Sequence, residues 1–213
     1  MVHICIEGNI GSGKSYFISK FAKEIRTQLG LNIITLSEPV DIWQDFHGTN
    51  MLEAMYSDPL KYAYQFQNLA LSTKIDQLLK PQNQHVLVER SIMAQKKIFI
   101  PLLFKENKIS VLEKDLLDHM IDNVLKMRQL NPTIYIYLKT SIVTAKRRID
   151  FRARTEERQV STEYLYDIDD RYNQWLDPNK MENLIIVDND HDHLNIQDLI
   201  DSLRLKLALF QDD

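Results

Sequence analysis

Short apolar runs alternate along the chain with longer stretches in which apolar residues recur every three or four positions. The short runs are rich in β-branched residues, which is typical of buried strands. Five are predicted as strands: Val2–Ile6, Ile33–Leu36, Val86–Val88, Thr133–Leu138 and Leu184–Val187. Strands separated by helices at this spacing favour right-handed βαβ units, and therefore an α/β fold with a parallel sheet and helices on both faces.

The stretches between these strands have the apolar periodicity of helices. Phe17–Leu29 is amphipathic, and the stretch from Pro59 to about Leu79 begins with proline, which suits a first helical turn. The clearest apolar stripe runs from Leu112 to Leu125, and a last helix is predicted from about Leu194. We find no internal repeat, linker or composition break, so we expect a single domain over residues 1–213.

Composition excludes several classes of protein. The net charge of −4 and the pI near 5.9 argue against a general nucleic-acid-binding surface. The longest apolar run, Ile98–Phe104, is too short to span a bilayer, so no membrane partner is expected. The first strand begins at Val2 and leaves no room for a targeting segment, and Cys5 is the only cysteine. These features predict a cytoplasmic protein.

The segment between the first strand and the first helix fits the phosphate-loop pattern of glycine, four residues and then Gly-Lys-Ser. Its residues are Gly8, Asn9, Ile10, Gly11, Ser12, Gly13, Lys14 and Ser15. Glycines let backbone N–H groups turn toward phosphates, the lysine reaches the β- and γ-phosphates, and the serine hydroxyl binds Mg²⁺. Nucleotide binding is therefore expected. Two short matches to GTPase patterns, Asp45–Gly48 and Thr73–Asp76, do not follow predicted strands and argue little for a GTPase.

Three further polar segments are expected at the same edge of the sheet. Glu38 follows the second predicted strand, Glu89 and Arg90 follow the third, and residues 147–158, rich in arginine, come after the fourth strand and its helix. Each segment by itself is explained by a helix terminus, a surface ion pair or a solvated helix face. Beside a phosphate loop they indicate a site, because ligands of parallel sheets bind beyond the carboxyl ends of the strands.

Six motifs now stand in order along the chain: GNIGSGKS, EPVDIW, MLEAMYSDP, FQNLA, ERSI and RARTEE. Together they resemble the deoxyribonucleoside kinases, the group of deoxycytidine and deoxyguanosine kinases, mitochondrial-type thymidine kinase and insect multisubstrate deoxynucleoside kinase. The resemblance runs from the first strand to at least Trp175. It implies a phosphate-loop kinase fold with a five-stranded sheet, a lid at about residues 148–160, and a homodimer paired through helices near the Leu112–Leu125 stripe.

The resemblance also implies a reaction and its catalytic groups. ATP, or another NTP, would donate its γ-phosphate to the 5′-hydroxyl of a deoxynucleoside in the presence of Mg²⁺. Glu38 would be the general base, Arg90 would hold the 5′-oxygen, and Ser15 and Glu89 would bind Mg²⁺. Three lid residues would close over the donor phosphates and three residues after the fifth strand would touch the donor base: Arg148, Arg152 and Arg154, and then Asp188, Asn189 and Asp190.

For the nucleoside, the resemblance implies a pocket with separate sugar and base contacts. Tyr56 and Glu157 would bind the 3′-hydroxyl of the sugar. Phe66 would stack on the base with Trp43 on its other side, and Gln67 would make two hydrogen bonds to the Watson–Crick edge. The pocket would also be lined by Leu52 and Met55.

Two positions depart from the family pattern. Lys74 stands where relatives carry arginine or methionine, and Gln95 where they carry aspartate or a small residue. The base preference is therefore open, with a lean to a pyrimidine, thymidine or deoxycytidine, or broad specificity. Two other functions remain as alternatives: a nucleoside monophosphate kinase resembling thymidylate kinase, which would need more basic residues for the acceptor phosphate, and a non-catalytic nucleotide-binding module.

Overall fold

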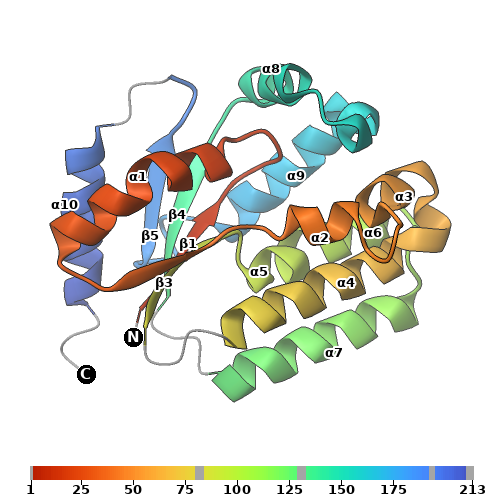
Figure 1. Ribbon diagram of the computed structural model, residues 1–213, viewed down its shortest axis with the longest axis horizontal. Helices are drawn as coiled ribbons and strands as arrows, with labels where there is room; N and C mark the ends of the chain where they lie inside the picture. Colours follow the sequence, from red (N-terminus) through yellow and green to blue (C-terminus); the bar gives the residue numbers. More distant parts are fainter. Residues whose placement is uncertain (1, 80–83, 129–132, 192–194, 210–213) are drawn as a thin grey trace.

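A parallel sheet forms the centre of the protein (Figure 1). The computed structural model describes residues 2–79, 84–128, 133–191 and 195–209. The five strands lie in the order β2-β3-β1-β4-β5, and each neighbouring pair is parallel. Their bounds are β1 His3–Glu7, β2 Ile33–Leu36, β3 His85–Glu89, β4 Thr133–Lys139 and β5 Leu184–Asp188. The predicted α/β fold class is confirmed. Four of the five strands end one residue later than expected, while β1 also begins one residue later and β3 one residue earlier.

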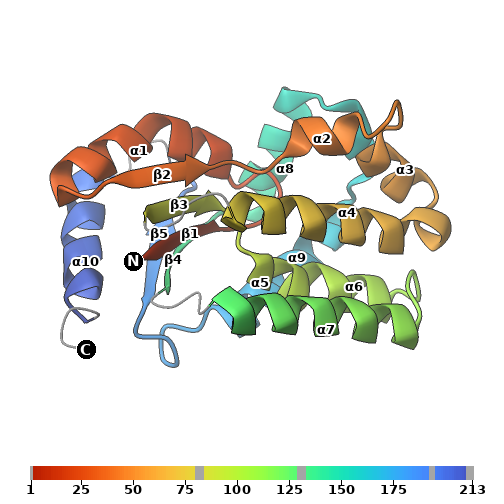
Figure 2. The same cartoon turned by 60° about the horizontal axis from the view of Figure 1, so that its bottom comes forward.

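Helices cover both faces of this sheet. Helices α1 and α10 cover one face, and α9 with the segment around α5 covers the other, while α3, α4, α6 and α7 gather into a block beside the sheet (Figures 1 and 2). The bounds are α1 Lys14–Leu29, α2 Val40–Gln44, α3 Met51–Ser57, α4 Pro59–Leu79, α5 Ile92–Ala94, α6 Ile100–Lys105, α7 Val111–Arg128, α8 Ile142–Arg152, α9 Thr162–Trp175 and α10 Ile196–Ala208. Two short irregular helices complete the set, η1 Gln95–Phe99 and η2 Thr155–Gln159.

The alternation of side chains along β1 divides the core. Ile4 and Ile6 are fully buried and pack with residues of α1 and α10. Cys5 and Glu7, between and after them, point to the other face, because successive strand residues face opposite sides. Each fully buried isoleucine stabilises the fold by roughly 1.5–3 kcal/mol relative to leaving it exposed. The apolar run predicted as a strand therefore supplies core residues to the layer of α1 and α10 and places two buried polar or weakly polar side chains on the other face.

The strand order decides where a ligand can bind. The chain passes from β1 to the edge strand β2, returns to β3 beside β1, and then crosses to β4 on the other side of β1. The connections that leave β1 and β4 separate at this switch point and open a crevice above the carboxyl ends of the strands. The loop after β1 and the segments after β2 and β3 all begin at this edge.

The helix that follows β3 contains a π-turn. In η1 the N–H of Ile100 donates to the carbonyl of Gln95, five residues earlier. Pro101 comes directly afterwards; it has no N–H, and its ring would clash with the carbonyl of Lys97 in a regular α-helix. A wider turn at this place accommodates the proline, and such turns are frequent at functional sites.

Among the described residues, no helix combines the length and the apolar character needed to cross a membrane.

Candidate active site

The phosphate loop lies between β1 and α1, as predicted, and its backbone leaves no room for larger residues. Gly11 has a φ of +75°, and a Cβ placed there would lie 2.4 Å from the carbonyl oxygen of Ala145. Both facts require glycine. Lys14 is buried, and its ammonium donates to the carbonyls of Gly8 at 3.2 Å and Asn9 at 2.9 Å. Burial first, and then the charge of Arg90, lower the pKa of Lys14 to about 7.

Ser15 and Glu89 form an oxygen-rich corner beside this loop. The Ser15 hydroxyl donates to Glu89 Oε1 at 2.6 Å, and Glu89 Oε2 accepts from the Glu38 N–H at 3.4 Å. A hydroxyl and a carboxylate next to a phosphate loop fit Mg²⁺, which takes oxygen ligands from one or two protein groups and fills the others with phosphate and water. The described residues contain no group of three or more His, Cys, Asp or Glu side chains that could hold a metal without such help.

Glu38 and Arg90 meet at the carboxyl ends of β2 and β3. Arg90 Nε lies 3.0 Å from Glu38 Oε1, and Lys74 Nζ lies 3.9 Å from the same oxygen. Burial raises the pKa of the Glu38 carboxyl, but the charges of Arg90, Lys74 and Lys14 outweigh it and hold that pKa below its ordinary value. Glu38 is therefore ionised at neutral pH, with its carboxylate turned toward cations.

Arg90 has a strained backbone conformation, and contacts with β1 and with Phe99 hold it in place. Its φ is +57°, an unusual value for a residue with a side chain, and its N–H donates to the carbonyl of Ile6 at 2.9 Å. The next N–H, of Ser91, donates to the buried carboxylate of Glu7 at 2.8 Å. The guanidinium carbon lies 4.8 Å from the ring centre of Phe99, a cation–π distance. The two hydrogen bonds hold the backbone at Arg90, and Phe99 and Glu38 hold its guanidinium in the absence of a ligand.

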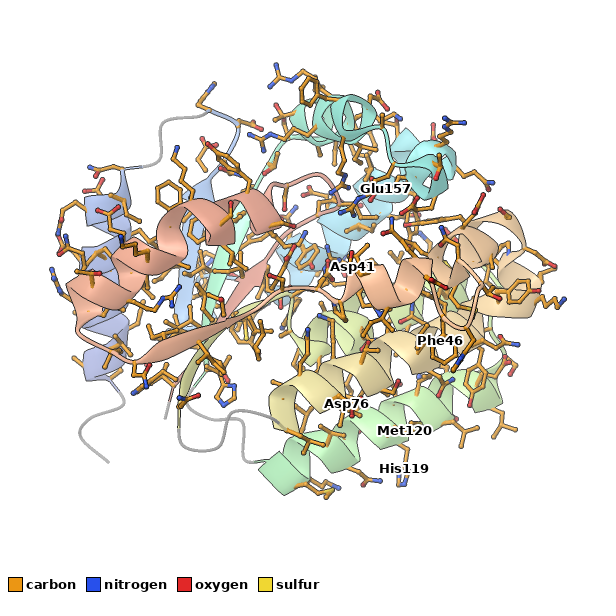
Figure 3. All side chains as sticks on the ribbon, viewed as in Figure 1. Asp41, Phe46, Asp76, His119, Met120 and Glu157 are labelled. Carbon is orange, nitrogen blue, oxygen red and sulfur yellow. The ribbon has the colours of Figure 1, made fainter. Side chains whose placement is uncertain are left out.

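The predicted lid comprises the end of α8 and η2, and its arginines are paired. Arg152 donates to both carboxylate oxygens of Glu157, at 2.6 and 3.0 Å, and Arg154 lies 3.6 Å from Glu157. Arg148 donates to the carbonyl of Asn189 at 2.9 Å. In Figure 3, Glu157 is labelled between the lid and α2. The carboxylate of Glu157 thus holds Arg152 and Arg154, two of the three lid arginines, where they line the cavity.

A cavity of about 520 Å³ joins these groups. We call the part lined by Gly11, Gly13, Lys14, Ser15, Glu38, Glu89, Arg90 and the lid the phosphate end, and the part lined by Trp43, Leu52, Met55, Tyr56, Phe66, Gln67, Gln95 and Phe99 the nucleoside end. Of all the predicted site residues, five do not line the cavity: Gly8, Asn9, Ser12, Asp188 and Asp190. Gly8, Asn9 and Ser12 shape the phosphate loop from behind.

The loop after β5 differs from its prediction. Asn189 lines the cavity and its amide donates to the carbonyl of Ser12. Asp190 instead accepts from the N–H of Ser141, 2.7 Å away, at the start of α8, and Asp188 accepts from the N–H of Asp190 at 3.0 Å. The two carboxylates therefore stabilise the turn that carries Asn189.

The aromatic residues of the nucleoside end correct another expectation. Trp43 was expected on the side of the base opposite Phe66, but the two rings contact each other edge to face, with centres 5.6 Å apart. A base does not fit between rings in such contact. The Trp43 indole N–H donates to the Thr73 hydroxyl at 3.0 Å, which holds the ring in this position. Phe66 can still offer its free face to a base.

Lys74 and Gln95, the two residues that depart from the family pattern, contact different ends of the cavity. The Lys74 ammonium donates to the carbonyls of Glu89 at 3.2 Å and Arg90 at 2.7 Å, so it supports the phosphate end. Gln95 Nε2 donates to the backbone oxygen of Gln67 at 3.2 Å and to its side-chain oxygen at 3.1 Å. Gln95, and not Lys74, is the neighbour of the residue expected to read the base.

Sequence reasoning missed Phe99 and Tyr164, which also line the cavity. Phe99 follows Gln95 by four residues, a spacing that places two side chains on one side of a helix, and this signal could have found it. Tyr164 lies near the start of α9, shortly after the arginine-rich segment of residues 147–158. The sequence around Tyr164 contains no pattern that distinguishes an aromatic residue that lines a pocket from one that is buried in the core.

Comparison with known proteins agrees with this geometry. A family model described as "Deoxynucleoside kinase" matches residues 4–206. The chain belongs to the deoxynucleoside kinase family. The predicted resemblance is therefore confirmed, and with it the phosphate-loop kinase fold.

Relatives within the family carry different names. Human mitochondrial thymidine kinase 2 is 31% identical over 174 residues, which cover 81% of this chain and 63% of that protein. A probable deoxycytidine kinase of fowlpox virus (strain NVSL) is 32% identical over 83% of this chain and 72% of its own length. Mitochondrial deoxyguanosine kinase of Xenopus laevis is 25% identical over 81% of this chain and 72% of its own length. The chain thus spans less than two thirds of the human relative, and the named bases differ among the three.

Proposed function

We propose that this protein is a deoxyribonucleoside kinase that transfers the γ-phosphate of ATP, or of another NTP, to the 5′-hydroxyl of a deoxynucleoside. One observation carries the proposal: the Glu38 carboxylate and the Arg90 guanidinium, 3.0 Å apart, line the same cavity as Lys14 and Ser15 of the phosphate loop. A base and a cation beside a triphosphate site are what transfer to an alcohol requires. Family membership supports the same conclusion.

Glu38 is the group proposed to accept the proton of the 5′-hydroxyl. Its lowered pKa keeps it ionised, so it orients the hydroxyl at once and takes the proton as the new oxygen–phosphorus bond forms. Arg90 lies close enough to contact the same oxygen and to stabilise negative charge on the transferred group. The rigid backbone of Arg90 keeps this pair in position without ligand.

The phosphate end is proposed to hold the donor. Lys14 would exchange its two carbonyl partners for phosphate oxygens, which offer negative charge where the carbonyls offer only dipoles. Ser15 and Glu89 would hold Mg²⁺, which would neutralise charge on the β- and γ-phosphates. Arg148, Arg152 and Arg154 would contact the donor phosphates from the lid, and Asn189 would lie near the donor base.

Release of the lid arginines would also prepare the sugar site. When Arg152 moves to phosphate, Glu157 loses its bidentate partner and can accept from a sugar hydroxyl. Tyr56 lies beside it: burial and then the charge of Glu157 raise the pKa of the Tyr56 phenol, which stays protonated and can donate. We therefore propose that both groups bind the 3′-hydroxyl, and that donor binding and sugar binding support each other.

The decisive experiment offers the protein γ-labelled ATP and Mg²⁺ with each of the four deoxynucleosides and, separately, with each monophosphate. Labelled monophosphates formed from nucleosides are expected. Label that passes only to monophosphates would point to a nucleoside monophosphate kinase. Binding of ATP without transfer to any acceptor would point to a nucleotide-binding module without catalysis.

We also propose that two copies pair through α7. In this helix Leu117 and Ile121 are buried, whereas Leu112, Leu116 and Met120 are 69%, 44% and 38% exposed. Met120 is labelled on α7 at the outer edge of the protein in Figure 3. An apolar row beyond the needs of the core fits a partner surface. Light scattering should give the mass of a dimer, Leu116→Glu should give a monomer, and Lys23→Glu, at an exposed position of α1, should not.

The cellular compartment also stays a proposal. Cys5 is buried and forms no disulfide with a described residue, which fits a reducing compartment such as the cytoplasm. Fluorescence microscopy of the tagged protein checks this.

A further inference from the structure

The amide of Gln95 can take only one orientation. Its Nε2 lies 3.2 Å from the backbone carbonyl of Gln67, an acceptor that cannot donate. Exchanging the oxygen and nitrogen of the Gln95 amide would bring two carbonyl oxygens together. The backbone of α4 therefore decides which atom of Gln95 faces it, and the side-chain oxygen of Gln95 must point the other way.

The orientation of the Gln95 amide also determines the orientation of the Gln67 amide. The same Nε2 of Gln95 lies 3.1 Å from Gln67 Oε1 and donates to it, so Gln67 turns its oxygen toward Gln95 and its Nε2 away. If the Gln67 amide were exchanged, two N–H₂ groups would face each other. Lys74 does not compete for either amide, because its ammonium binds the carbonyls of Glu89 and Arg90.

One buried acceptor remains without a donor. Gln95 is only 3% exposed and lines the cavity, and among the described residues none donates to its Oε1. Gln67 Oε1 keeps a second lone pair, and Gln67 Nε2 keeps its protons. The nucleoside end therefore presents two acceptors, one on Gln95 and one on Gln67, followed by one donor. A buried acceptor left unpaired is costly, so the ligand is expected to supply the donors.

The four bases differ in how well the hydrogen-bond donors and acceptors on their edges match this pattern. Cytosine and adenine offer an amino group with two N–H donors beside a ring nitrogen that accepts. Guanine offers its amino group and a ring N–H beside a carbonyl. Thymine offers one ring N–H between two carbonyls, so one of the two glutamine oxygens would face a carbonyl oxygen. The pattern fits every base that carries an amino group and does not fit thymine.

We propose that Gln95, by fixing the orientation of Gln67 and presenting its own oxygen, makes the protein select nucleosides whose base carries an exocyclic amino group, and so take deoxycytidine in preference to thymidine. This inference rests on the proposed kinase function and deepens it. The sequence favours a pyrimidine nucleoside as substrate, and this inference selects deoxycytidine among the pyrimidines, although the human relative is named a thymidine kinase.

Four pyrimidine nucleosides form a matched test. Deoxycytidine has the amino group, 5-methyldeoxycytidine has the amino and a methyl group, deoxyuridine has neither, and thymidine has the methyl group only. We expect kcat/KM of the two amino compounds to exceed that of the other two by ~5–150-fold, the effect of one unpaired buried polar group. A ranking that follows the methyl group, or equal rates for deoxycytidine and deoxyuridine, would overturn the proposal.

The Gln95→Met variant tests the residue itself. Methionine has similar volume and no amide, so the deoxycytidine-to-deoxyuridine ratio of kcat/KM should fall to within a few-fold of one. Gln65→Met, an exposed substitution on α4, the helix that carries Gln67, is the matched control and should keep the wild-type ratio. An unchanged ratio in a folded Gln95→Met protein would show that another residue selects the base.

Calorimetry separates failure of this inference from failure of the proposed function. If no nucleoside is phosphorylated, the kinase proposal fails, but the affinities of the wild-type protein for deoxycytidine and deoxyuridine can still be compared directly. Tighter binding of deoxycytidine by the same ~5–150-fold supports selection by the amino group. Equal affinities, tighter binding of deoxyuridine, or no binding of either overturn it.

Discussion

Charges and backbone groups make up the phosphate end of the cavity, whereas rings and uncharged amides make up the nucleoside end. At the phosphate end, the charges of Arg90, Lys74 and Lys14 lower the pKa of Glu38, and the charges of Glu38 and Arg90 in turn alter the pKa of both lysines. At the nucleoside end, the decisive contacts are neutral hydrogen bonds such as the one from Gln95 to Gln67. Charge acts on any phosphate, but the direction of an amide distinguishes one base from another.

This difference predicts how substitutions should divide. A change at the phosphate end should lower the rate for every nucleoside by a similar factor and leave their ranking intact. A change at the nucleoside end should alter the ranking. Substitutions at the phosphate end that reorder the nucleosides would break the comparison, because they would show that the two ends are not independent.

The largest effect is expected for Glu38→Gln. Glutamine keeps the shape of the side chain and one acceptor but cannot take a proton, so kcat should fall by ~10²–10⁴-fold. Nucleoside affinity should be retained, and the factor should be equal for all nucleosides. Steady-state kinetics with two nucleosides measure this, and Asp41→Asn, an exposed carboxylate on α2, is the control. An unchanged kcat would remove Glu38 from the mechanism.

An intermediate effect is expected for Lys14→Met. Loss of the charged hydrogen bonds to phosphate should weaken binding of a non-hydrolysable ATP analogue by ~10–150-fold. Binding of a nucleoside without nucleotide should change less than about twofold. Isothermal titration of each ligand gives both values, with Lys23→Met on the same helix as control. Equal loss of affinity for the nucleoside would mean that Lys14 also holds the nucleoside end together.

The smallest effect is expected for Trp43→Phe. It removes the indole hydrogen bond to Thr73 and keeps an aromatic ring beside Phe66. The loss should be about 0.5–1.5 kcal/mol, which lowers the melting temperature by about 1–6 °C in a protein of this size. Thermal unfolding of Trp43→Phe, Thr73→Val and the double variant measures the coupling. Strictly additive losses would show that this hydrogen bond does not hold the ring.

The phosphate end could be predicted from the sequence because its parts are local or follow strands directly. The phosphate loop is eight consecutive residues, Gly8–Ser15, whose turn requires glycine at Gly11. Glu38 and Arg90 each come just after a strand, and parallel strands end at one edge, so their proximity follows from the topology. Five strands and the long helices could be read from periodicity for the same reason.

The nucleoside end could be predicted only as a set of residues. Phe66, Gln67, Trp43 and Gln95 were all expected there, but their contacts depend on packing between elements that no local pattern encodes. The edge contact of Trp43 with Phe66 depends on Thr73, which lies about two turns beyond Phe66 on the same side of α4. The sequence position of Lys74 suggested a place in the base site. Its ammonium instead lies near the Glu38 carboxylate and donates to the carbonyl of Arg90, at the phosphate end.

The π-turn at η1 connects a proline outside the cavity with two residues inside it. The wide turn begins at Gln95 and ends at Phe99, and it keeps the ring of Pro101 from clashing with the carbonyl of Lys97. A lineage that replaced Pro101 would remove the steric reason for the wide turn, and the helix would return to regular winding. Gln95 and Phe99 would then change their positions in the cavity, so the choice of nucleoside would change although no residue that lines the cavity had been substituted.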